Sequence, residues 1–213
     1  MSTYQTIKEE LLAVTKQSYN EQLFAGTSGN LSIYDRETGI MAITPSSVPY
    51  DTMTADDIVI LKLDGEIIEG TNRPSSEWRM HAVIYKERDD VKAIVHAHSP
   101  YATSFSVSDE TIPVILIEMV PFLGGDIKVA RFGLPGTPEV GLEALKVLED
   151  RNSCTLANHG TLAIGGSLAQ AHIRAIYVED AAKIYHFAKC NGNVQAVGEE
   201  FVEIMKNRTK KKA

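Results

Sequence analysis

The fold of this 213-residue chain is best approached from the stretch Lys92-Ala-Ile-Val-His-Ala-His-Ser99. Its apolar run predicts a buried β-strand, on which side chains two positions apart face the same way. His96 and His98 would then stand side by side at the end of the strand, as two metal ligands would. Histidines that are hydrogen-bonded in a core or at a surface fit the same pattern, so the pair alone leaves both interpretations open.

Strand-like and helix-like segments alternate on both sides of this stretch. Helices are expected at residues 4–22, 75–88, 137–149, 167–189 and 198–207, with one more beginning at Pro100. Strands are expected at residues 31–34, 40–44, 58–63, 113–117, 127–130, 154–157 and 160–164. The interspersed order predicts an α/β fold. Since no linker or repeat divides the chain, a single domain is expected over residues 1–213.

The composition argues against several classes of protein. A formal net charge of -7 leaves no basic surface to neutralise phosphates, which argues against nucleic acid as a partner. No apolar run approaches the ~18 residues that span a bilayer, and Lys8, Glu9 and Glu10 interrupt any N-terminal signal segment. Cys154 and Cys190 stand in unrelated contexts and predict no disulfide framework. We therefore expect a soluble cytoplasmic protein with no membrane partner.

Two residues outside the first stretch extend the candidate metal site. His159 lies in Asn158-His-Gly160 between two strand-like runs, a placement similar to that of the first pair. Three histidines leave a coordination position open, which is typical of a catalytic metal. Glu77, in the first turn of an expected helix, is the fourth candidate ligand. A carboxylate is also favoured there by the helix dipole alone, so its role stays open at this point.

Three turns rich in serine and glycine are candidate anion sites. They are Gly26-Thr-Ser-Gly-Asn30, Thr44-Pro-Ser-Ser47 and Ser75-Ser76. Hydroxyl groups and free backbone N–H groups in such turns bind phosphate, above all at the start of a helix. Each turn taken alone is explained equally well without a ligand.

Five motifs, taken together and in order, resemble the class II sugar-phosphate aldolase/epimerase family over residues 5–190. The motifs are Gly26-Thr-Ser-Gly-Asn30, Ile43-Thr-Pro45, Pro74-Ser-Ser-Glu-Trp78, His96-Ala-His98 and Asn158-His-Gly160. The family includes fuculose-phosphate aldolases, ribulose-5-phosphate 4-epimerases, methylthioribulose-1-phosphate dehydratases and the non-catalytic adducin branch. Adducin-like interaction modules lack the metal histidines, which this chain retains.

The resemblance implies a fold, an assembly and a role for each motif residue. The implied fold is a three-layer α/β/α sandwich around a mixed, mainly antiparallel sheet, assembled as a homotetramer with active sites at subunit interfaces. Glu77 would leave the metal to act as acid and base. The metal ligands implied by the motifs are Glu77, His96, His98 and His159. The implied phosphate-binding residues are Gly29, Asn30, Ser46, Ser47, Ser75 and Ser76.

One catalytic position departs from the aldolase pattern. The family's fuculose-type aldolases carry a tyrosine where this chain has Ile117, and a second, C-terminal tyrosine has no counterpart in residues 201–213. Glu118 is the expected substitute as a catalytic residue, with a water-exposed carboxylate at a strand end as the alternative. Tyr50 and Tyr101 are further candidate donors, and core tyrosines are the alternative for both.

These residues together predict a lyase that depends on a divalent metal. We expect cleavage of a ketose 1-phosphate, of the L-fuculose 1-phosphate or 5-deoxypentulose 1-phosphate type, to dihydroxyacetone phosphate and a short aldehyde through a metal-stabilised enediolate. The alternative is a methylthioribulose-1-phosphate dehydratase, to which Glu118 also points. A 4-epimerase or an adducin-like module is expected less. Zn²⁺ is the expected metal, and Mn²⁺, Co²⁺ or Fe²⁺ would suit the same ligands.

Overall fold

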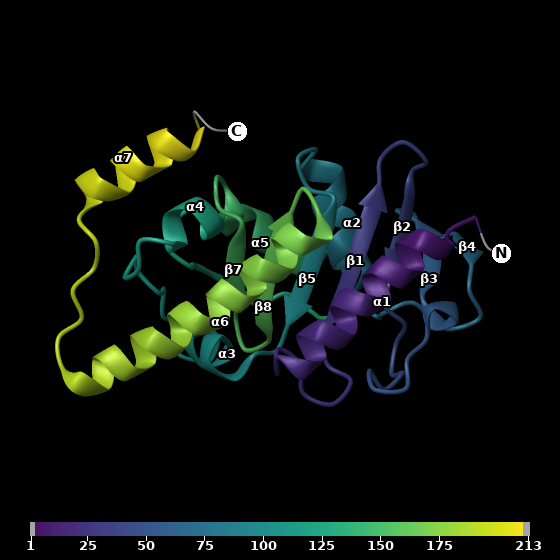
Figure 1. Ribbon diagram of the computed structural model, residues 1–213, viewed down its shortest axis with the longest axis horizontal. Helices are drawn as coiled ribbons and strands as arrows, with labels where there is room; N and C mark the ends of the chain where they lie inside the picture. The colour runs from purple at the N-terminus through teal and green to yellow at the C-terminus, as the bar shows by residue number, and fades with distance from the viewer. Residues whose placement is uncertain (1–2, 211–213) are drawn as a thin grey trace.

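An eight-stranded sheet in the order β4-β3-β2-β1-β5-β8-β7-β6 forms the middle layer of the computed structural model, which describes residues 3–210 (Figure 1). Neighbouring strands pair antiparallel, except that β6 and β7 are parallel. The strands are β1 (Asn30–Asp35), β2 (Ile40–Ile43), β3 (Val59–Lys62), β4 (Ile67–Glu69), β5 (Ala93–Ala97), β6 (Val129–Ala130), β7 (Ser153–Leu156) and β8 (Gly160–Gly165). The α/β class and the mixed, mainly antiparallel sheet are thereby confirmed.

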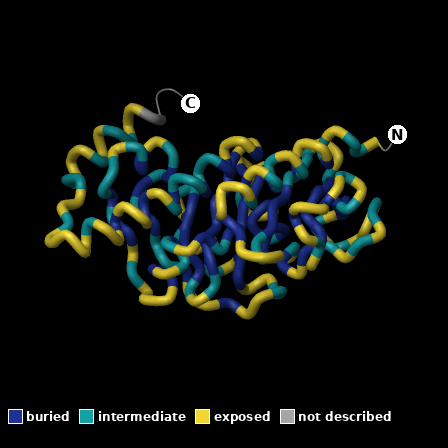
Figure 2. Tube along the Cα trace, turned by 60° about the horizontal axis from the view of Figure 1, so that its bottom comes forward, coloured by how far each residue is buried: buried dark blue, intermediate teal, exposed yellow. Residues whose placement is uncertain are grey.

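Helices cover both faces of the sheet. They are α1 (Gln5–Asn20), α2 (Trp78–Glu87), α3 (Pro100–Val107), α4 (Met119–Leu123), α5 (Glu139–Leu148), α6 (Leu168–Asn191) and α7 (Glu199–Lys210), with a short 3-10 helix at Ala55–Asp57. Helices α1 and α6 lie on the near face in Figure 1, and α2 and α5 lie behind the sheet. The buried positions follow the strands in the interior of the molecule (Figure 2).

Strand β5 shows how the alternation of side chains divides the core. Its residues Ala93, Val95 and Ala97 pack in the cluster that includes α1 and α6. Ile94 packs in the cluster that includes α2 and α5. Because side chains alternate along a strand, His96 lies on the same face as Ile94. The strand therefore directs His96 toward the helix that Glu77 precedes.

A third hydrophobic cluster joins the second half of α6 to α3, α4 and α7 at one end of the sheet. Helix α7 follows a loop beyond α6 and lies over α4 (Figure 1). Among residues 3–210, no helix is both long and apolar enough to cross a membrane. Both cysteines are free, Cys154 buried and Cys190 exposed.

The expected strand at residues 113–117 is wrong. Ile112 forms a single bridge with Ile127, and the residues that follow are irregular as far as α4. Pro113 has no N–H group to donate to a ladder, and the N–H of Ile115 contacts the sulfur of Met119 instead of a strand. Helix α2 also begins later than expected, at Trp78, so that Ser75, Ser76 and Glu77 form the turn before it.

Candidate metal centre and anion cavity

Three segments far apart in the sequence supply the four candidate ligands. His96 is the fourth residue of β5, and His98 follows that strand with its N–H donating to the Leu23 carbonyl at 3.1 Å. His159 lies in the β7–β8 turn after Asn158, whose φ of 55° is left-handed, a region that asparagine tolerates. A Cβ at Gly160 would overlap the Ala97 carbonyl oxygen and lie 3.2 Å from ring atoms of both His96 and His98, so only glycine lets the turn approach this strand end so closely.

The four side chains converge on one point. The Nε2 atom of His96 lies 2.9 Å from Oε2 of Glu77 and 3.0 Å from Nε2 of His98. The Nε2 atom of His159 lies 3.3 Å from Oε1 of Glu77. One ligand atom from each of the four residues falls within 4.8 Å of the others. The expected metal-ligand set is thus brought together by the fold.

Hydrogen bonds prepare this cluster for a cation. The Nδ1–H group of His96 donates to the Thr161 carbonyl at 2.8 Å, so Nε2, which faces the cluster, is the nitrogen that would bind a cation. Glu77 is buried, and its Oε1 atom receives no hydrogen bond despite the ion-pair distance to His159. Several lone pairs and an unpartnered carboxylate oxygen in a buried space are satisfied by a divalent cation.

The electrostatics agree with this interpretation. Burial raises the pKa of Glu77, but the charge of His96 and its hydrogen bond outweigh burial and hold that pKa well below its ordinary value. Burial, together with the charges of His96 and His159, lowers the pKa of His98 to about 4. The carboxylate is therefore ionised and His98 is neutral near pH 7, which are the states that bind a metal.

A cavity of about 260 Å³ opens beside the cluster. It is lined by Thr27, Ser28, Gly29, Asn30, Pro45, Ser46, Ser47, Ser75, Ser76, Glu77, His98, Pro135 and His159. All six residues expected to bind phosphate therefore line the same space as Glu77. The sequence did not single out Pro135, which reaches the cavity from the loop after β6 and carries no polar group that would have drawn attention to it.

The Asn30 side chain is hydrogen-bonded to Glu77 and His81, so it is not free to bind a ligand. Its Nδ2 donates to Oε2 of Glu77 at 3.1 Å, and its Oδ1 pairs with Nε2 of His81 at 2.6 Å. His81 in turn pairs through Nδ1 with the Ser32 hydroxyl at 2.6 Å, and Ser32 contacts the Tyr85 hydroxyl at 2.7 Å. We call Ser32, His81 and Tyr85 the His81 network. The one signal of the His81 network in the sequence is the spacing of four residues between Glu77 and His81.

Glu118 is not brought to this cavity within one chain. It precedes α4 and lines an apolar hollow with Ile117 and Met205. The N–H of Asn152, just before β7, donates to the Leu123 carbonyl of α4 at 2.8 Å, whereas His159 follows the opposite end of β7. The expected catalytic role of Glu118 thus stays a prediction.

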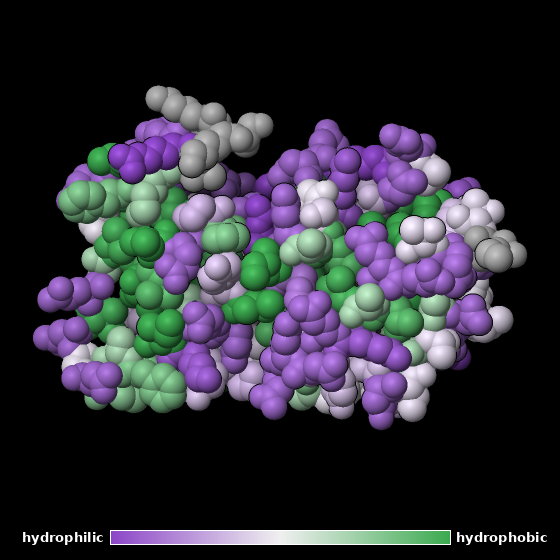
Figure 3. All heavy atoms as spheres, in the orientation of Figure 1, coloured by the Kyte–Doolittle hydropathy of each residue, from purple (hydrophilic) through white to green (hydrophobic). Residues whose placement is uncertain are grey.

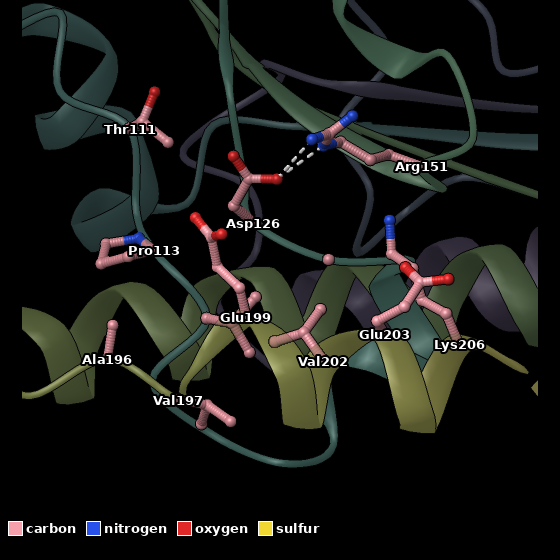
Figure 4. A pocket seen from close by; sticks show the side chains of 12 residues that line it. Thr111, Pro113, Asp126, Arg151, Ala196, Val197, Glu199, Val202, Glu203 and Lys206 are labelled. Atoms are coloured by element: carbon pink, nitrogen blue, oxygen red, sulfur yellow. Dashed lines mark hydrogen bonds and ion pairs between the residues drawn. The ribbon is translucent and has the colours of Figure 1, made fainter. Parts of the chain in front are cut away.

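A larger cavity of about 480 Å³ lies beneath α7 (Figure 4). Two ion pairs lie in and around it: Arg151 lies 2.6 Å from Asp126, and Lys206 lies 2.9 Å from Asp150. Within residues 3–210, the one group of side chains arranged to hold a metal is the four-residue cluster described above. The smaller cavity is therefore the candidate active site.

Comparisons with known proteins agree with the geometry. Residues 9–186 match the model of the class II aldolase and adducin N-terminal domain. The chain is 37% identical to a 5-deoxy-D-ribulose 1-phosphate aldolase of Bacillus thuringiensis serovar kurstaki, over 92% of both chains. It is 36% identical to a 5-methylthioribulose-1-phosphate/5-deoxyribulose-1-phosphate aldolase of Rhodospirillum rubrum, over 84% of this chain and 80% of the relative. A solved L-fuculose 1-phosphate aldolase superposes with a TM-score of 0.92 at 39% identity, covering 99% of this chain and 98% of that one.

Proposed function

The chain belongs to the class II aldolase and adducin family and is an aldolase, and we propose that it cleaves a ketose 1-phosphate of the 5-deoxypentulose 1-phosphate or L-fuculose 1-phosphate type. The products are dihydroxyacetone phosphate and a short aldehyde. The observation that carries this proposal is the single cavity shared by Glu77, two of the histidines and the serine-rich turns. One molecule could contact all of them through a phosphate at one end and a carbonyl at the other.

The residues of the cavity divide the work. His96, His98, His159 and Glu77 would hold the divalent cation, which when bound supplies Lewis-acid polarisation of the substrate carbonyl. The backbone and hydroxyl groups at Gly29, Asn30, Ser46, Ser47, Ser75 and Ser76 would bind the phosphate and orient the sugar. When the C3–C4 bond breaks, C3 gains a proton and the C4 hydroxyl loses one. Glu77, after leaving the metal and taking up a proton from water, would deliver that proton to C3.

The base at the C4 hydroxyl comes, in our proposal, from a neighbouring subunit. Glu118 lies away from the cavity of its own chain but is partly exposed beside Ile117, which is 69% exposed. Apolar atoms gather over the end of the molecule formed by α3, α4 and the second half of α6 (Figure 3). Val107 of α3 and Ile184 and Phe187 of α6 are exposed. We propose a homotetramer in which such surfaces are buried and Glu118 reaches the active site of the partner.

The remaining features of the proposal follow from the ligand chemistry. Class II aldolases use a divalent metal, and three imidazoles with one carboxylate suit Zn²⁺, with Mn²⁺, Co²⁺ or Fe²⁺ as other occupants. The two free cysteines accord with the reducing environment of the cytoplasm. We also propose that residues 1–213 act as one catalytic domain.

A coupled assay for dihydroxyacetone phosphate tests the function. We expect one equivalent to be released per equivalent of 5-deoxyribulose 1-phosphate or L-fuculose 1-phosphate consumed, with kcat/KM ranking the two substrates. Methylthioribulose 1-phosphate belongs in the same panel because a dehydratase would remove water from it without releasing dihydroxyacetone phosphate. Dehydration without release of that product, with no cleavage of any ketose 1-phosphate, would overturn the proposal.

A further inference from the structure

Within residues 3–210, no lysine or arginine lines the cavity beside Glu77. From this chain, a phosphate bound there away from the metal cluster would be held by N–H and O–H dipoles of residues 3–210. Such a site depends on the orientation of each peptide group, because a carbonyl oxygen turned into the cavity would repel the phosphate. The direction of the carbonyls in the turn before Asn30 is therefore decisive.

Tyr50 holds two of these carbonyls from behind the cavity. Its hydroxyl donates to the carbonyl of Ser28 at 2.9 Å and to that of Gly29 at 2.7 Å. A phenol has one hydrogen, so the two acceptors share it. Tyr50 is 3% exposed and does not line the cavity. Burial raises the pKa of its hydroxyl, which therefore remains a donor at every pH of interest.

The ring of Tyr50 is itself held in place. It stacks on Phe24 with ring centroids 5.0 Å apart, and its centroid lies 5.6 Å from that of Tyr19. These contacts lie within the hydrophobic cluster that α1 and α6 share, so the hydroxyl is presented from a rigid base. The same segment carries Ser46 and Ser47 into the cavity, which links the two serine-rich turns through one tyrosine.

The turn that Tyr50 holds also packs tightly against β5, the strand that carries His96. Gly29 has a φ of +79°, and a Cβ there would lie 2.5 Å from the Phe24 ring and 2.9 Å from the His96 carbonyl. The next residue, Asn30, pairs with His96 in the sheet. A rotation of the peptide after Ser28 or Gly29 would thus alter the anion site next to the metal ligands.

We propose that Tyr50 is a positioning residue for phosphate: its hydroxyl keeps the carbonyl oxygens of Ser28 and Gly29 pointing away from the cavity. The N–H and hydroxyl groups of the turn then remain available to the substrate. This inference rests on the proposed function, because it concerns the anion half of the same site. Tyr50 touches no reacting atom, so its contribution belongs to binding rather than to bond cleavage.

The test is Tyr50→Phe, which removes the hydroxyl and keeps the aromatic packing. We expect KM for the ketose 1-phosphate to rise about tenfold, as for the loss of a buried hydrogen bond. The inhibition constant of inorganic phosphate, used as a competitive probe, should rise by a similar factor. The value of kcat should stay within about twofold, and the bound metal should be unchanged, because neither the ligands nor Glu77 is disturbed.

Tyr185→Phe is the matched control. Its hydroxyl is bonded to Glu110 at 2.8 Å in the cluster of α3 and α6, outside the cavity. We expect wild-type KM and phosphate inhibition from this variant. An unchanged phosphate inhibition constant in Tyr50→Phe, or a fall in kcat with unchanged KM, would overturn the inference. In either case, release of dihydroxyacetone phosphate by the wild-type enzyme would still support the proposed function. Absence of competition by phosphate in the wild-type enzyme would instead remove the anion site on which both depend.

Discussion

Two buried clusters that contain histidine lie next to one another, and they differ in whether their polar atoms are satisfied. The His81 network is fully buried, and each of its side-chain polar atoms has a hydrogen-bond partner. In the metal cluster Glu77 and His96 are buried and His98 and His159 are partly buried, Oε1 of Glu77 lacks a hydrogen bond, and imidazole nitrogens face one another. Asn30 joins the two clusters, with one end of its amide on each.

The protonation states sharpen the contrast. Burial, and then the charge of His96, lowers the pKa of His81 to about 3, so this ring is neutral and serves as one donor and one acceptor. Its Nε2–H donates to Asn30, which obliges the amide of Asn30 to turn its NH₂ toward Glu77. A buried polar group that is complete within the protein stabilises the structure. One that lacks a partner beside three histidines, as Oε1 of Glu77 does, is a candidate contact for a bound ion. Four substitutions across the boundary test this distinction.

The largest effect is expected from His96→Ala. It removes a ligand at the centre of the metal cluster, so bound metal should fall below a tenth of the wild-type amount and aldol cleavage by about 10³-fold or more. Metal analysis of the purified protein and the assay for dihydroxyacetone phosphate measure both. Circular dichroism should show an unchanged fold. Wild-type activity in a metal-free variant would contradict the metal assignment.

Glu77→Gln should come next. The amide keeps the shape of the side chain and an oxygen for the metal but cannot transfer a proton, so kcat should fall by about 10²- to 10⁴-fold. The three histidines remain, and most of the metal should stay bound. The ratio of lost activity to lost metal separates this variant from His96→Ala. Equal losses of metal and activity would mean that Glu77 is a ligand without a role as acid or base.

His81→Leu lies across the boundary and should act mainly on stability. It leaves the oxygen of Asn30 and the hydroxyl of Ser32 without their partner, at a cost of about 2–4 kcal/mol in the free energy of unfolding. The catalytic rate should fall only about tenfold, because Asn30, which holds Glu77, becomes less well positioned while the Glu77 carboxylate itself is unchanged. Urea unfolding and steady-state kinetics give the two numbers.

The acid sensitivity of the same variant provides its control. Folding lowers the pKa of His81 from 6.5 to about 3, so the unfolded chain takes up a proton that the folded protein does not bind. That difference reduces wild-type stability as the pH falls from about 6.5 toward 4, by ~1.4 kcal/mol per pH unit for one proton. His81→Leu should show a slope that is smaller by about this amount. Identical slopes would place a charged His81 in the folded protein.

Tyr85→Phe should have the smallest effect. Tyr85 is the member of the network farthest along the chain of hydrogen bonds from Glu77, and its hydroxyl contacts the hydroxyl and carbonyl of Ser32. Removing it should cost about 1 kcal/mol and change kcat/KM by less than about threefold. A loss of activity as large as that of Glu77→Gln would show that the two clusters function as one.

Part of the candidate site can be predicted from short sequence patterns. The alternation of side chains on a strand places His96 and His98 together, and the fold confirms both the strand and the mixed sheet around it. The strand expected at residues 113–117 fails for a local reason as well, because Pro113 cannot donate to a ladder. The anion turns are recognisable because serine and glycine near a helix start have a known chemistry.

The chemical groups of the site can be read from the order of residues: three histidines, a glutamate and serine-rich turns, on an α/β framework. Which of these groups come into contact depends on how the strands and helices pack. The pairing of strand β1 with β5 sets Asn30 opposite His96, and the packing of the turn before α2 brings Glu77 within hydrogen-bond distance of Asn30, 47 residues away. The packing of the fold also leaves Oε1 of Glu77 without a hydrogen bond, gives the ring nitrogens of His81 hydrogen-bond partners, and places Tyr50 behind the turn that would bind phosphate. Periodicity reports only on neighbours along the chain, whereas these contacts depend on the order in which the strands assemble.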